Sequence, residues 1–376
     1  MEHYLDNAAT TKPCAEAAAA VMSCISAHYG NPSSLHRKGL EAQHEVEYAR
    51  NQIAGALGCK AQEIVFTSGA TESSNLAIRG AVAAYGRNRK KIVASAVEHA
   101  SVKATLSYLE TLGFTVVTVP PAADGEYHTE DFLREIDSSV CLVSMMLVNN
   151  ENGCRLPVEN VFRMVKRNDP EIITHCDAVQ GFLKIPFKPR TLCADLVSVS
   201  GHKVHALKGV GALYIRHGVR VKPILCGSEQ ERGLRPGTES VPLIASFGAA
   251  TEKLSLNIEE RLERVSQLRS SLIAQLREMD GVIIRDIEGA SPYVLNISLL
   301  GYRSEIVLHY LEQRAVYVSS GSACSKGASS GVLELFGAKP AEVDSALRIS
   351  FCAENTEEDI AALVQGLRDA QKELMH

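Results

Sequence analysis

Two stretches of small residues each end in a side chain that can form a covalent bond. Ser198-Val-Ser-Gly-His-Lys203 ends in a lysine, and Ser319-Ser-Gly-Ser-Ala-Cys324 ends in a cysteine. A lysine amine can hold a carbonyl compound as a Schiff base, and a thiol can accept an atom from a bound substrate. A protein that combines both chemistries is expected to remove sulfur from an amino acid.

A third stretch has the composition of an anion-binding turn. Thr67-Ser-Gly-Ala-Thr-Glu72 joins a predicted strand to a predicted helix. Free backbone N–H groups and hydroxyls at such a place can bind a phosphate. Ser200 and His202 could add donors to the same phosphate. The alternative is an ordinary helix cap made by Ser68 or Thr71.

Three polar side chains that follow predicted strands could surround a flat cofactor. Asp177 ends a strand, and in parallel α/β sheets this end faces the ligand crevice. Its carboxylate could pair with the pyridinium nitrogen of pyridoxal phosphate, and Gln180 could donate to the ring oxygen. His99 follows another strand and could stack on the ring and move protons. The alternatives are a helix cap for Asp177 and an ordinary core position for His99.

Cys324 and Arg348 are candidates for the substrate end of the site. Cys324 lies in a run of small residues, 319–331, that has few side chains to bury and is expected to be exposed. Lys326 would favour its thiolate, and the alternative is an unreactive surface thiol. Arg348 lies on an otherwise apolar strand, where it could bind a substrate α-carboxylate or form a structural ion pair.

These side chains require a scaffold of alternating strands and helices, and the hydrophobic pattern predicts one. Predicted strands are 63–67, 91–96, 114–119, 141–148, 172–176, 196–200 and 211–215, and predicted helices are 72–85, 100–112 and 158–167. This order indicates an α/β protein with a mostly parallel sheet. A helical run from Leu243 to Met279 leads to the short strands 282–285, 294–298, 316–318 and 346–351. They indicate a smaller α+β domain.

Length, charge and cysteine content narrow the function classes. The chain has 376 residues and a net charge of −5, which gives no footprint for direct nucleic-acid or membrane binding. Residues 1–12 lack the pattern of a signal peptide, so we expect a cytoplasmic protein. The ten cysteines include no C-x-x-C pair. We therefore expect no intrinsic metal site and mostly buried free thiols.

Several stretches match one family together, in order along nearly the whole chain. They are Tyr4-Leu-Asp-Asn-Ala-Ala-Thr10, Gly30-Asn-Pro-Ser33, Phe66-Thr-Ser-Gly-Ala-Thr-Glu-Ser-Ser-Asn75, Glu98-His99, Val148-Asn-Asn-Glu-Asn-Gly153, Asp177-Ala-Val-Gln180, Ser200-Gly-His-Lys203, Lys208-Gly-Val-Gly211, Arg235-Pro-Gly-Thr-Glu239, Ser319–Cys324 and Leu347-Arg-Ile-Ser350. With these motifs the chain resembles the cysteine desulfurases of the NifS/IscS type. These enzymes belong to the class V aminotransferase family of fold-type I pyridoxal-phosphate enzymes.

The resemblance implies three parts of the chain. Residues 16–255 would form a large domain that binds pyridoxal 5'-phosphate on a mostly parallel seven-stranded sheet. Residues 256–376 would form a small α+β C-terminal domain that carries the Cys324 loop, and residues 1–15 would pack with that domain. The family also implies a homodimer with shared sites.

The resemblance further implies a role for each candidate residue. Lys203 would hold the cofactor as a Schiff base and move protons. Asp177 and Gln180 would bind the ring nitrogen and the phenolic oxygen, and His99 would stack on the ring. Cys324 would attack the sulfur of L-cysteine, leaving L-alanine and a persulfide. The ligands of the phosphate would be Ala70, Thr71, Ser200, His202 and Thr238 of the partner subunit, and those of the substrate carboxylate would be Asn150 and Arg348.

Three stretches depart from the family pattern and leave the sulfur acceptor open. The segment after Cys324 lacks Leu-Glu-Pro-Ser, the C-terminal stretch 371–376 lacks a further extension, and Gly227-Ser-Glu-Gln-Glu231 replaces a stretch richer in glycine. The acceptor could be an iron–sulfur scaffold, whose nascent cluster Cys324 could contact, or a tRNA-thiolation enzyme.

Other function classes compete with this interpretation. An aminotransferase of the same fold would not need Cys324, and a selenocysteine lyase would act on selenocysteine instead of cysteine. A sulfur carrier without cofactor would not need Lys203, Asp177 and His99. A metal or redox protein has the weakest support, because the cysteine spacings form no ligand cluster.

Overall fold

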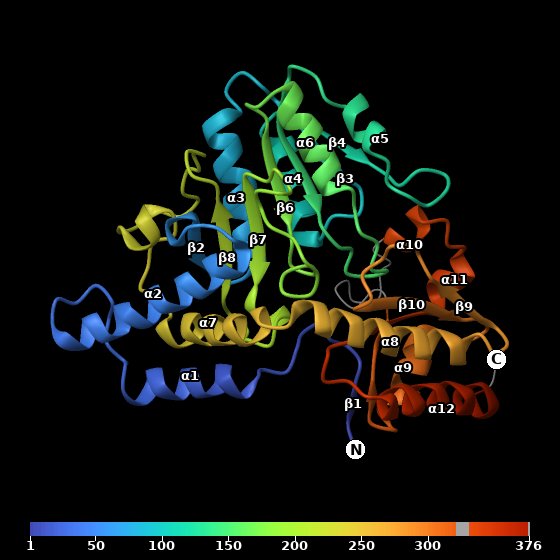
Figure 1. Cartoon of the computed structure of the whole chain (residues 1–376). Helices are drawn as coiled ribbons and strands as arrows, with labels where there is room; N and C mark the ends of the chain where they lie inside the picture. The colour runs from blue at the N-terminus through green and yellow to red at the C-terminus, as the bar shows by residue number, and fades with distance from the viewer. Residues whose placement is uncertain (321–330, 375–376) are drawn as a thin grey trace.

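A seven-stranded sheet forms the centre of the larger part of the molecule (Figure 1). The computed structural model describes residues 1–320 and 331–374. The strand order is β2-β8-β7-β6-β5-β3-β4, and β8 alone runs antiparallel to its neighbours. The strands are β2 (Ile64–Thr67), β3 (Lys91–Ser95), β4 (Thr115–Val119), β5 (Val140–Met146), β6 (Ile173–Asp177), β7 (Leu196–Ser200) and β8 (Gly211–Ile215). The expected mostly parallel α/β sheet is confirmed.

Helices cover both faces of this sheet because its strands are apolar on both sides. In β8, Ala212 and Tyr214 belong to one buried cluster, whereas Leu213 and Ile215 belong to another on the opposite face. The helices are α1 (Ala15–Ser26), α2 (Arg37–Leu57), α3 (Ala70–Tyr85), α4 (Ala100–Thr111), α5 (Thr129–Arg134), α6 (Val158–Asn168) and α7 (Val241–Ser255), and the 3₁₀ turns are η1 (Ala61–Glu63), η2 (Gly201–Lys203) and η3 (Gln230–Gly233).

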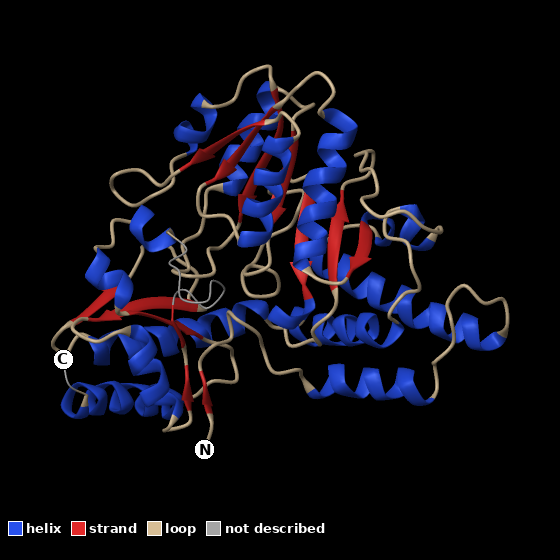
Figure 2. Cartoon of the chain, turned by 180° about the vertical axis from the view of Figure 1, so that it is seen from behind, coloured by secondary structure: helices blue, strands red, loops and turns tan. Residues whose placement is uncertain are grey.

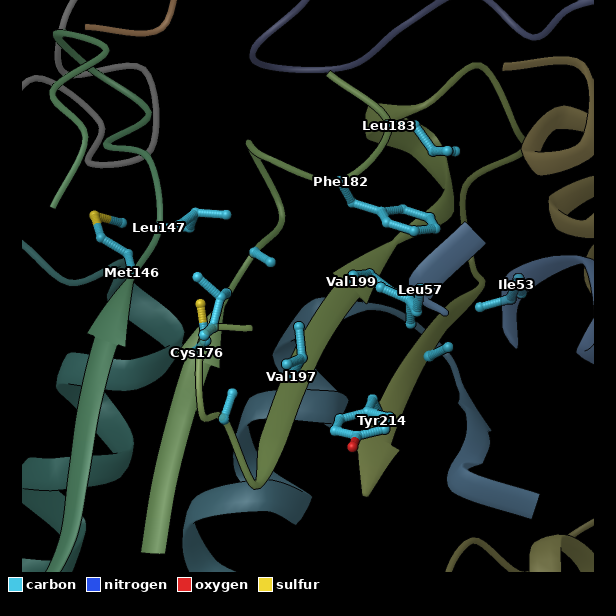
Figure 3. Packing of buried hydrophobic residues seen from close by; sticks show 14 of the residues in the cluster. Ile53, Leu57, Met146, Leu147, Cys176, Phe182, Leu183, Val197, Val199 and Tyr214 are labelled. Carbon is cyan, nitrogen blue, oxygen red and sulfur yellow. The ribbon is translucent and has the colours of Figure 1, made fainter. Parts of the chain in front are cut away.

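The first cluster fixes α2 to the sheet. Figure 3 shows Ile53 and Leu57 of α2 beside Val199 of β7 and Tyr214 of β8. Helix α7 lies between α1 and α2 and contacts both (Figure 1). The second cluster lies under α3 and α4 and includes Leu76 and Leu106. Burial of both faces explains why the strands read as continuous apolar runs.

The predicted helical run from Leu243 to Met279 is two helices in the structure. Helix α7 ends at Ser255, and α8 (Ile258–Leu276) begins after two intervening residues. Asn257 precedes α8 with φ −136° and ψ 48°, which is not helical. Serine and asparagine favour helix ends because their side chains compete for backbone hydrogen bonds. The charged residues continue across this run, so the sequence pattern did not indicate the end of one helix and the start of the next.

A smaller part lies beside the sheet, around α8 and α12 (Figure 2). Strand β1 pairs in parallel with β11, and an antiparallel sheet has the order β12-β13-β10-β9. These elements are β1 (His3–Tyr4), β9 (Val282–Arg285), β10 (Val294–Leu299), β11 (Val316–Tyr317), β12 (Ser319–Ser320), β13 (Ala346–Ser350), α9 (Ser304–Glu312), α10 (Val332–Leu335), α11 (Pro340–Asp344) and α12 (Glu357–Glu373). Leu5 belongs to the apolar cluster of this part, with residues between Val265 and Leu367. The division into 1–15, 16–255 and 256–376 stays a prediction.

The carboxyl ends of the parallel strands share one edge, which meets the smaller part. Residues just after β5 contact β10 and β13: Asn296 Nδ2 donates to Glu151 O at 3.4 Å, and Arg348 Nη1 donates to Asn150 O at 3.1 Å. The fold therefore brings a substrate-binding candidate of the smaller part to the ligand edge of the sheet. Within the described ranges, no helix combines the length and apolar character needed to cross a bilayer.

Candidate active site

Lys203 lies in the turn after β7. A Cβ on Gly201 would lie 2.9 Å from Val210 Cγ1, so the tight fold of this turn favours a glycine. The Lys203 ammonium is half-buried and donates to the carbonyl oxygens of Ala8 and Ala9, each at 2.6 Å. The N-terminal segment therefore reaches the lysine that the sequence singled out.

Asp177 and His99 lie at the same edge, at the ends of β6 and of the segment after β3. Asp177 is 5% exposed, and its Oδ1 accepts the N–H of Val179 at 3.0 Å. Burial raises the pKa of the Asp177 carboxyl, whereas the charges of His99 and Lys203 oppose this rise. His99 Nδ1 accepts the N–H of Ser101 at 3.2 Å, which leaves the proton of a neutral ring on Nε2. The structure thus groups Asp177, His99 and Lys203.

A second buried carboxyl group, Glu98, lies next to Asp177. Glu98 Oε1 accepts the N–H of Met146 at 2.6 Å and the hydroxyl of Ser95, and Met146 pairs with Asp177 across β5 and β6. Burial, and to a lesser degree the charge of Asp177, raises the pKa of Glu98 to about 8. At neutral pH Glu98 is therefore mostly protonated and places little charge beside Asp177. Sequence reasoning gave Glu98 no role, although its place before His99 was a signal.

The turn between β2 and α3 has the backbone of an anion-binding site. Gly69 has φ +153°, a conformation that favours glycine. Helix α3 begins at Ala70, so the N–H groups of its first turn have no acceptor within the helix. Ser68 N–H donates to Glu72 Oε2 at 2.7 Å and holds the turn, and Thr71 is exposed in it. Ala70 and Thr71 thus begin α3 at this turn, and their role as anion ligands stays a prediction.

Ser200 ends β7 and His202 follows it in η2, and β8 separates β7 from β2 in the sheet. Ser200 is buried and His202 is half-buried, with His202 Nδ1 3.3 Å from Thr10 Oγ1. Burial, and then the charge of Lys203, lowers the pKa of His202 to about 4. The ring is therefore neutral at pH 7 and can donate one hydrogen bond without bringing a charge.

Gln180 follows β6, and two neighbours fix its amide. Its Nε2 donates to Ala8 O at 3.0 Å, and its Oε1 accepts from Lys184 Nζ at 2.8 Å. Lys184 is 6% exposed, and burial, followed by the charge of Lys203, lowers its pKa to about 7. Sequence reasoning missed Lys184. Its signal was a lysine inside the apolar run Phe182–Phe187.

Arg348 connects the smaller part to the ends of the sheet strands. Its Nη1 donates to the backbone oxygen of Asn150 at 3.1 Å, and its Nη2 pairs with Asp6 Oδ1 at 2.9 Å. Arg348 is 4% exposed, and its Nε is buried with no hydrogen-bond partner among residues 1–320 and 331–374. The arginine thus forms the structural ion pair that the sequence left open, and it retains a donor for a further acceptor.

Thr238 lies apart from these groups within the same chain. It is exposed, in the loop after η3. The loop is fixed by Arg235, whose Nε donates to Glu72 Oε1 at 3.0 Å at the start of α3. An exposed threonine on an anchored loop is free to contact another subunit.

Cys324 lies outside the described residues. The chain before it ends in β12, where Ser319 pairs in register with Arg348 of β13. Of the nine cysteines in the described ranges, four are buried, so the expectation of mostly buried thiols holds for fewer than half. The others are the exposed Cys226 and the partly buried Cys14, Cys59, Cys193 and Cys352.

The grouped residues complement one kind of ligand. In order along the edge, they offer N–H groups for an anion, the amine of Lys203, the buried carboxyl group of Asp177 and a guanidinium at Arg348. A flat molecule with a phosphate, an aldehyde and a basic ring nitrogen matches the first three. An amino acid matches the fourth through its carboxylate.

Comparisons with known proteins agree on one family. The pattern of the family described as "Aminotransferase class-V" matches residues 3–363. The "Cysteine desulfurase" of Trichormus azollae is 38% identical over 368 residues, which cover 96% of this chain and 91% of that protein. A solved structure named "NIFS-LIKE PROTEIN" superposes with a TM-score of 0.94 at 35% identity and covers 100% of both chains. Another, "SspA in complex with cysteine", has a TM-score of 0.82 at 30% identity and covers 95% of this chain and 100% of that chain.

Proposed function

The chain belongs to the class-V aminotransferases and, within them, to the cysteine desulfurases, and from this premise we propose that it binds pyridoxal 5'-phosphate and takes sulfur from L-cysteine. The products are L-alanine and a persulfide on Cys324, which passes its sulfur to an acceptor protein. The observation that supports this most strongly is the meeting of Lys203, Asp177 and His99 at one edge of the sheet.

The residues at this edge fit the cofactor. Lys203 would hold it covalently, Asp177 would pair with its ring nitrogen, and His99 would stack on the ring. Gln180 would donate to the phenolic oxygen, since Lys184 occupies its Oε1 and leaves Nε2 as the donor. The phosphate ligands would be Ala70, Thr71, Ser200 and His202. When bound, the cofactor supplies an aldehyde for the amine and a ring that withdraws electrons from the substrate.

Asp177 and Glu98 are neighbouring buried carboxyl groups, and they have different roles. Asp177 would pair with the ring nitrogen, and the protonated Glu98 adds no charge beside it. A proton shared between Asp177 and the ring nitrogen would favour the protonated ring, which is the form that accepts electrons. Glu98 also fixes the end of β5 through the Met146 N–H.

Lys203 and Arg348 position the reacting amino acid. Lys203 Nζ donates to the backbone oxygens of Ala8 and Ala9, which hold the amine at this edge of the sheet. When it is not bonded to the cofactor, the same amine could deliver or accept a proton. Arg348, together with Asn150, would bind the substrate carboxylate. This carboxylate must compete with Asp6, which holds Arg348 Nη2 at 2.9 Å.

Cys324 completes the reaction. Its thiolate attacks the sulfur of the substrate, an S–S bond forms and the C–S bond breaks. The electron pair of the broken bond remains on carbon, which takes up a proton to become the methyl group of alanine. Ser320 precedes Cys324 by four residues, a contour length of about 14 Å, and β12 starts this segment beside Arg348.

The homodimer is supported by the apolar side chains that α1 and α2 leave exposed. Such a concentration of exposed apolar side chains is typical of a protein interface. Both helices project beyond the sheet in Figure 1. On these helices the exposed apolar side chains are Met22, Ile25, Leu40 and Tyr48, and the loop between them also exposes Tyr29 and Leu35. Thr238 of the partner subunit would then contribute to the phosphate site. A monomeric mass in light scattering would contradict this arrangement.

The acceptor that takes the sulfur from Cys324 is a protein with a reactive thiol. An iron–sulfur scaffold and a tRNA-thiolation enzyme both provide one. Both present the same chemistry to a persulfide, so we propose only that the acceptor is a protein with a reactive thiol. A direct transfer assay with purified scaffold and thiolation proteins distinguishes the two.

A paired product assay tests the proposed reaction. Wild type, Lys203→Ala and Cys324→Ala are incubated with L-cysteine and a reductant, and alanine and sulfide are quantified. We expect equal amounts of both products from the wild type and neither from the variants. Of the two variants, only Cys324→Ala should retain the visible absorption of the cofactor. Full sulfide release by Cys324→Ala would refute the persulfide step. Alanine that requires an added keto acid would favour an aminotransferase.

A further inference from the structure

A histidine, a cysteine and a glutamate from distant parts of the chain meet on the side of the molecule that carries the N-terminal segment. His205 follows η2, whereas Cys352 and Glu354 lie in the turn between β13 and α12. One ligand atom of each residue lies within 4.8 Å of the other two. We propose that His205, Cys352 and Glu354 form a binding site for Zn²⁺, separate from the residues that would hold the cofactor and independent of the proposed function.

The distances between the three ligand atoms are close to those expected around a bound Zn²⁺. Zn–N bonds of about 2.0 Å and Zn–S bonds of about 2.3 Å at tetrahedral angles place ligand atoms about 3.3–3.8 Å apart. His205 Nε2 and Glu354 Oε2 are already 3.7 Å apart. The largest separation within the cluster is 4.8 Å, so a shift of about 1 Å in one side chain brings all three into range.

His205 is oriented as a metal ligand. Its Nδ1 lies 2.9 Å from the backbone oxygen of Lys12, so Nδ1 carries the proton and Nε2 directs a lone pair toward the cluster. Histidine ligands usually donate their second N–H to a carbonyl or carboxylate in this way. The backbone at His205 has φ +58°, a conformation that a residue with a side chain adopts at some energetic cost. Lys12 and the turn together therefore fix the ring.

Cys352 and Glu354 complete a donor set that selects the metal. Imidazole and thiolate favour Zn²⁺ over Mg²⁺ or Ca²⁺, which prefer oxygen ligands. On binding, the Cys352 S–H proton leaves, a Zn–S bond forms and no electron is transferred. The Glu354 side chain is 57% exposed and can move to the ion without disturbing the core.

The surroundings leave room for a fourth ligand. His205, Cys352 and Glu354 line a cavity of about 770 Å³, whose opposite wall is formed by the N-terminal segment. Water can enter such a cavity and complete a tetrahedral set of three protein ligands. The lysines Lys12, Lys208 and Lys253 also line it. They disfavour a weakly held cation, so strong bonds to nitrogen and sulfur are needed.

The position of the site links two elements of the active site. His205 is two residues after Lys203, and Cys352 is four residues after Arg348. A metal bound here would tie the turn that carries the lysine to the strand that carries the arginine. The sequence analysis predicted no intrinsic metal site because it considered only spacing along the chain.

Zinc binding by the cofactor-loaded protein tests the proposal. The Cys324→Ser variant serves as parent, because a second reactive thiol would otherwise compete for the metal. Parent, His205→Asn, Cys352→Ser and Glu354→Gln are each dialysed against buffered free Zn²⁺, and bound zinc is measured by mass spectrometry. Matched controls are His217→Asn and Cys226→Ser, which change an exposed histidine and an exposed cysteine elsewhere.

We expect one Zn²⁺ per chain in the parent and in both controls. We expect at least a 10-fold weaker affinity in the Cys352 and His205 variants and a smaller loss in Glu354→Gln. X-ray absorption of the zinc-loaded parent should show one sulfur ligand at about 2.3 Å with lighter ligands at about 2.0 Å. Equal zinc binding by parent and Glu354→Gln together with a sulfur-free absorption spectrum would overturn the proposal. The proposal would also be overturned if Cys226→Ser were the only substitution that lowered the zinc affinity. Glu354 is exposed, so its variant remains informative if substitution of the partly buried His205 or Cys352 prevents folding.

Discussion

Replacing Lys184 by methionine should remove a pH dependence of stability that the fold imposes. Lys184 is 6% exposed, and its pKa falls from 10.5 to about 7, first because of burial and then because of Lys203. Below pH 7 the lysine is protonated in both the folded and the unfolded state. Between pH 7 and 10.5 only the unfolded chain holds this proton. The free energy of unfolding of the wild type therefore rises with pH across this window.

The magnitude follows from the size of the shift. A change from 10.5 to about 7 corresponds, at 1.36 kcal/mol per unit, to about 5 kcal/mol over the whole window. Between pH 7 and 9.5 the wild type should gain about 3 kcal/mol of stability relative to Lys184→Met. Methionine fills a similar volume without a charge, so the variant should lack this rise.

Urea unfolding at several pH values between 7 and 9.5, without added cofactor, measures the difference. Lys188→Met is the matched control, because Lys188 is exposed in the same segment and should leave the slope of the wild type unchanged. The reasoning would be refuted if the gain in unfolding free energy between pH 7 and 9.5 differed by less than about 1 kcal/mol between wild type and Lys184→Met. The Lys184 ammonium would then be charged at little cost inside the protein.

Three further changes test other parts of the account. Glu98→Gln should abolish a loss of wild-type stability of about 4 kcal/mol between pH 4.5 and 8, because the folded state holds the Glu98 proton in this range, and urea unfolding at both limits measures it. Gly211→Ala should lower the free energy of unfolding by about 1–3 kcal/mol, since its Cβ would lie 2.7 Å from Gly69 Cα; Gly55→Ala, which meets no atom within 4 Å, should cost nothing. Arg348→Lys should raise KM for cysteine about 10–100-fold, because lysine keeps the charge but loses the two-pronged contact; an unchanged KM would remove Arg348 from the substrate site.

The sheet could be predicted from the sequence because its strands are buried on both faces. Strands β7 and β8 have the predicted bounds 196–200 and 211–215, since both are apolar runs next to glycine. The long helices α1 and α2 were not predicted. Helix α1 buries Ala17 and Cys24 but also exposes the apolar Met22 and Ile25, so its apolar residues occupy several faces and mark no single one in the sequence.

The site could be predicted only where residues adjoin a strand end. Asp177 ends β6, Lys203 and His99 follow β7 and β3, and parallel strands bring their ends together. Glu98 and Lys184 acquire their shifted pKa values from burial and from neighbours distant in the sequence, which no local pattern reports. The ion pair of Arg348 could not be predicted either, because its partner Asp6 comes from the opposite end of the chain.

Locating the sulfur on the protein is the most direct test of the central claim. Wild type and Lys203→Ala are incubated with L-cysteine without reductant, alkylated, digested and analysed by mass spectrometry. The account predicts one extra sulfur atom on the peptide that contains Cys324 in the wild type and none in Lys203→Ala. Extra sulfur on Cys226 instead, or an equal amount on Cys324 in Lys203→Ala, would contradict it.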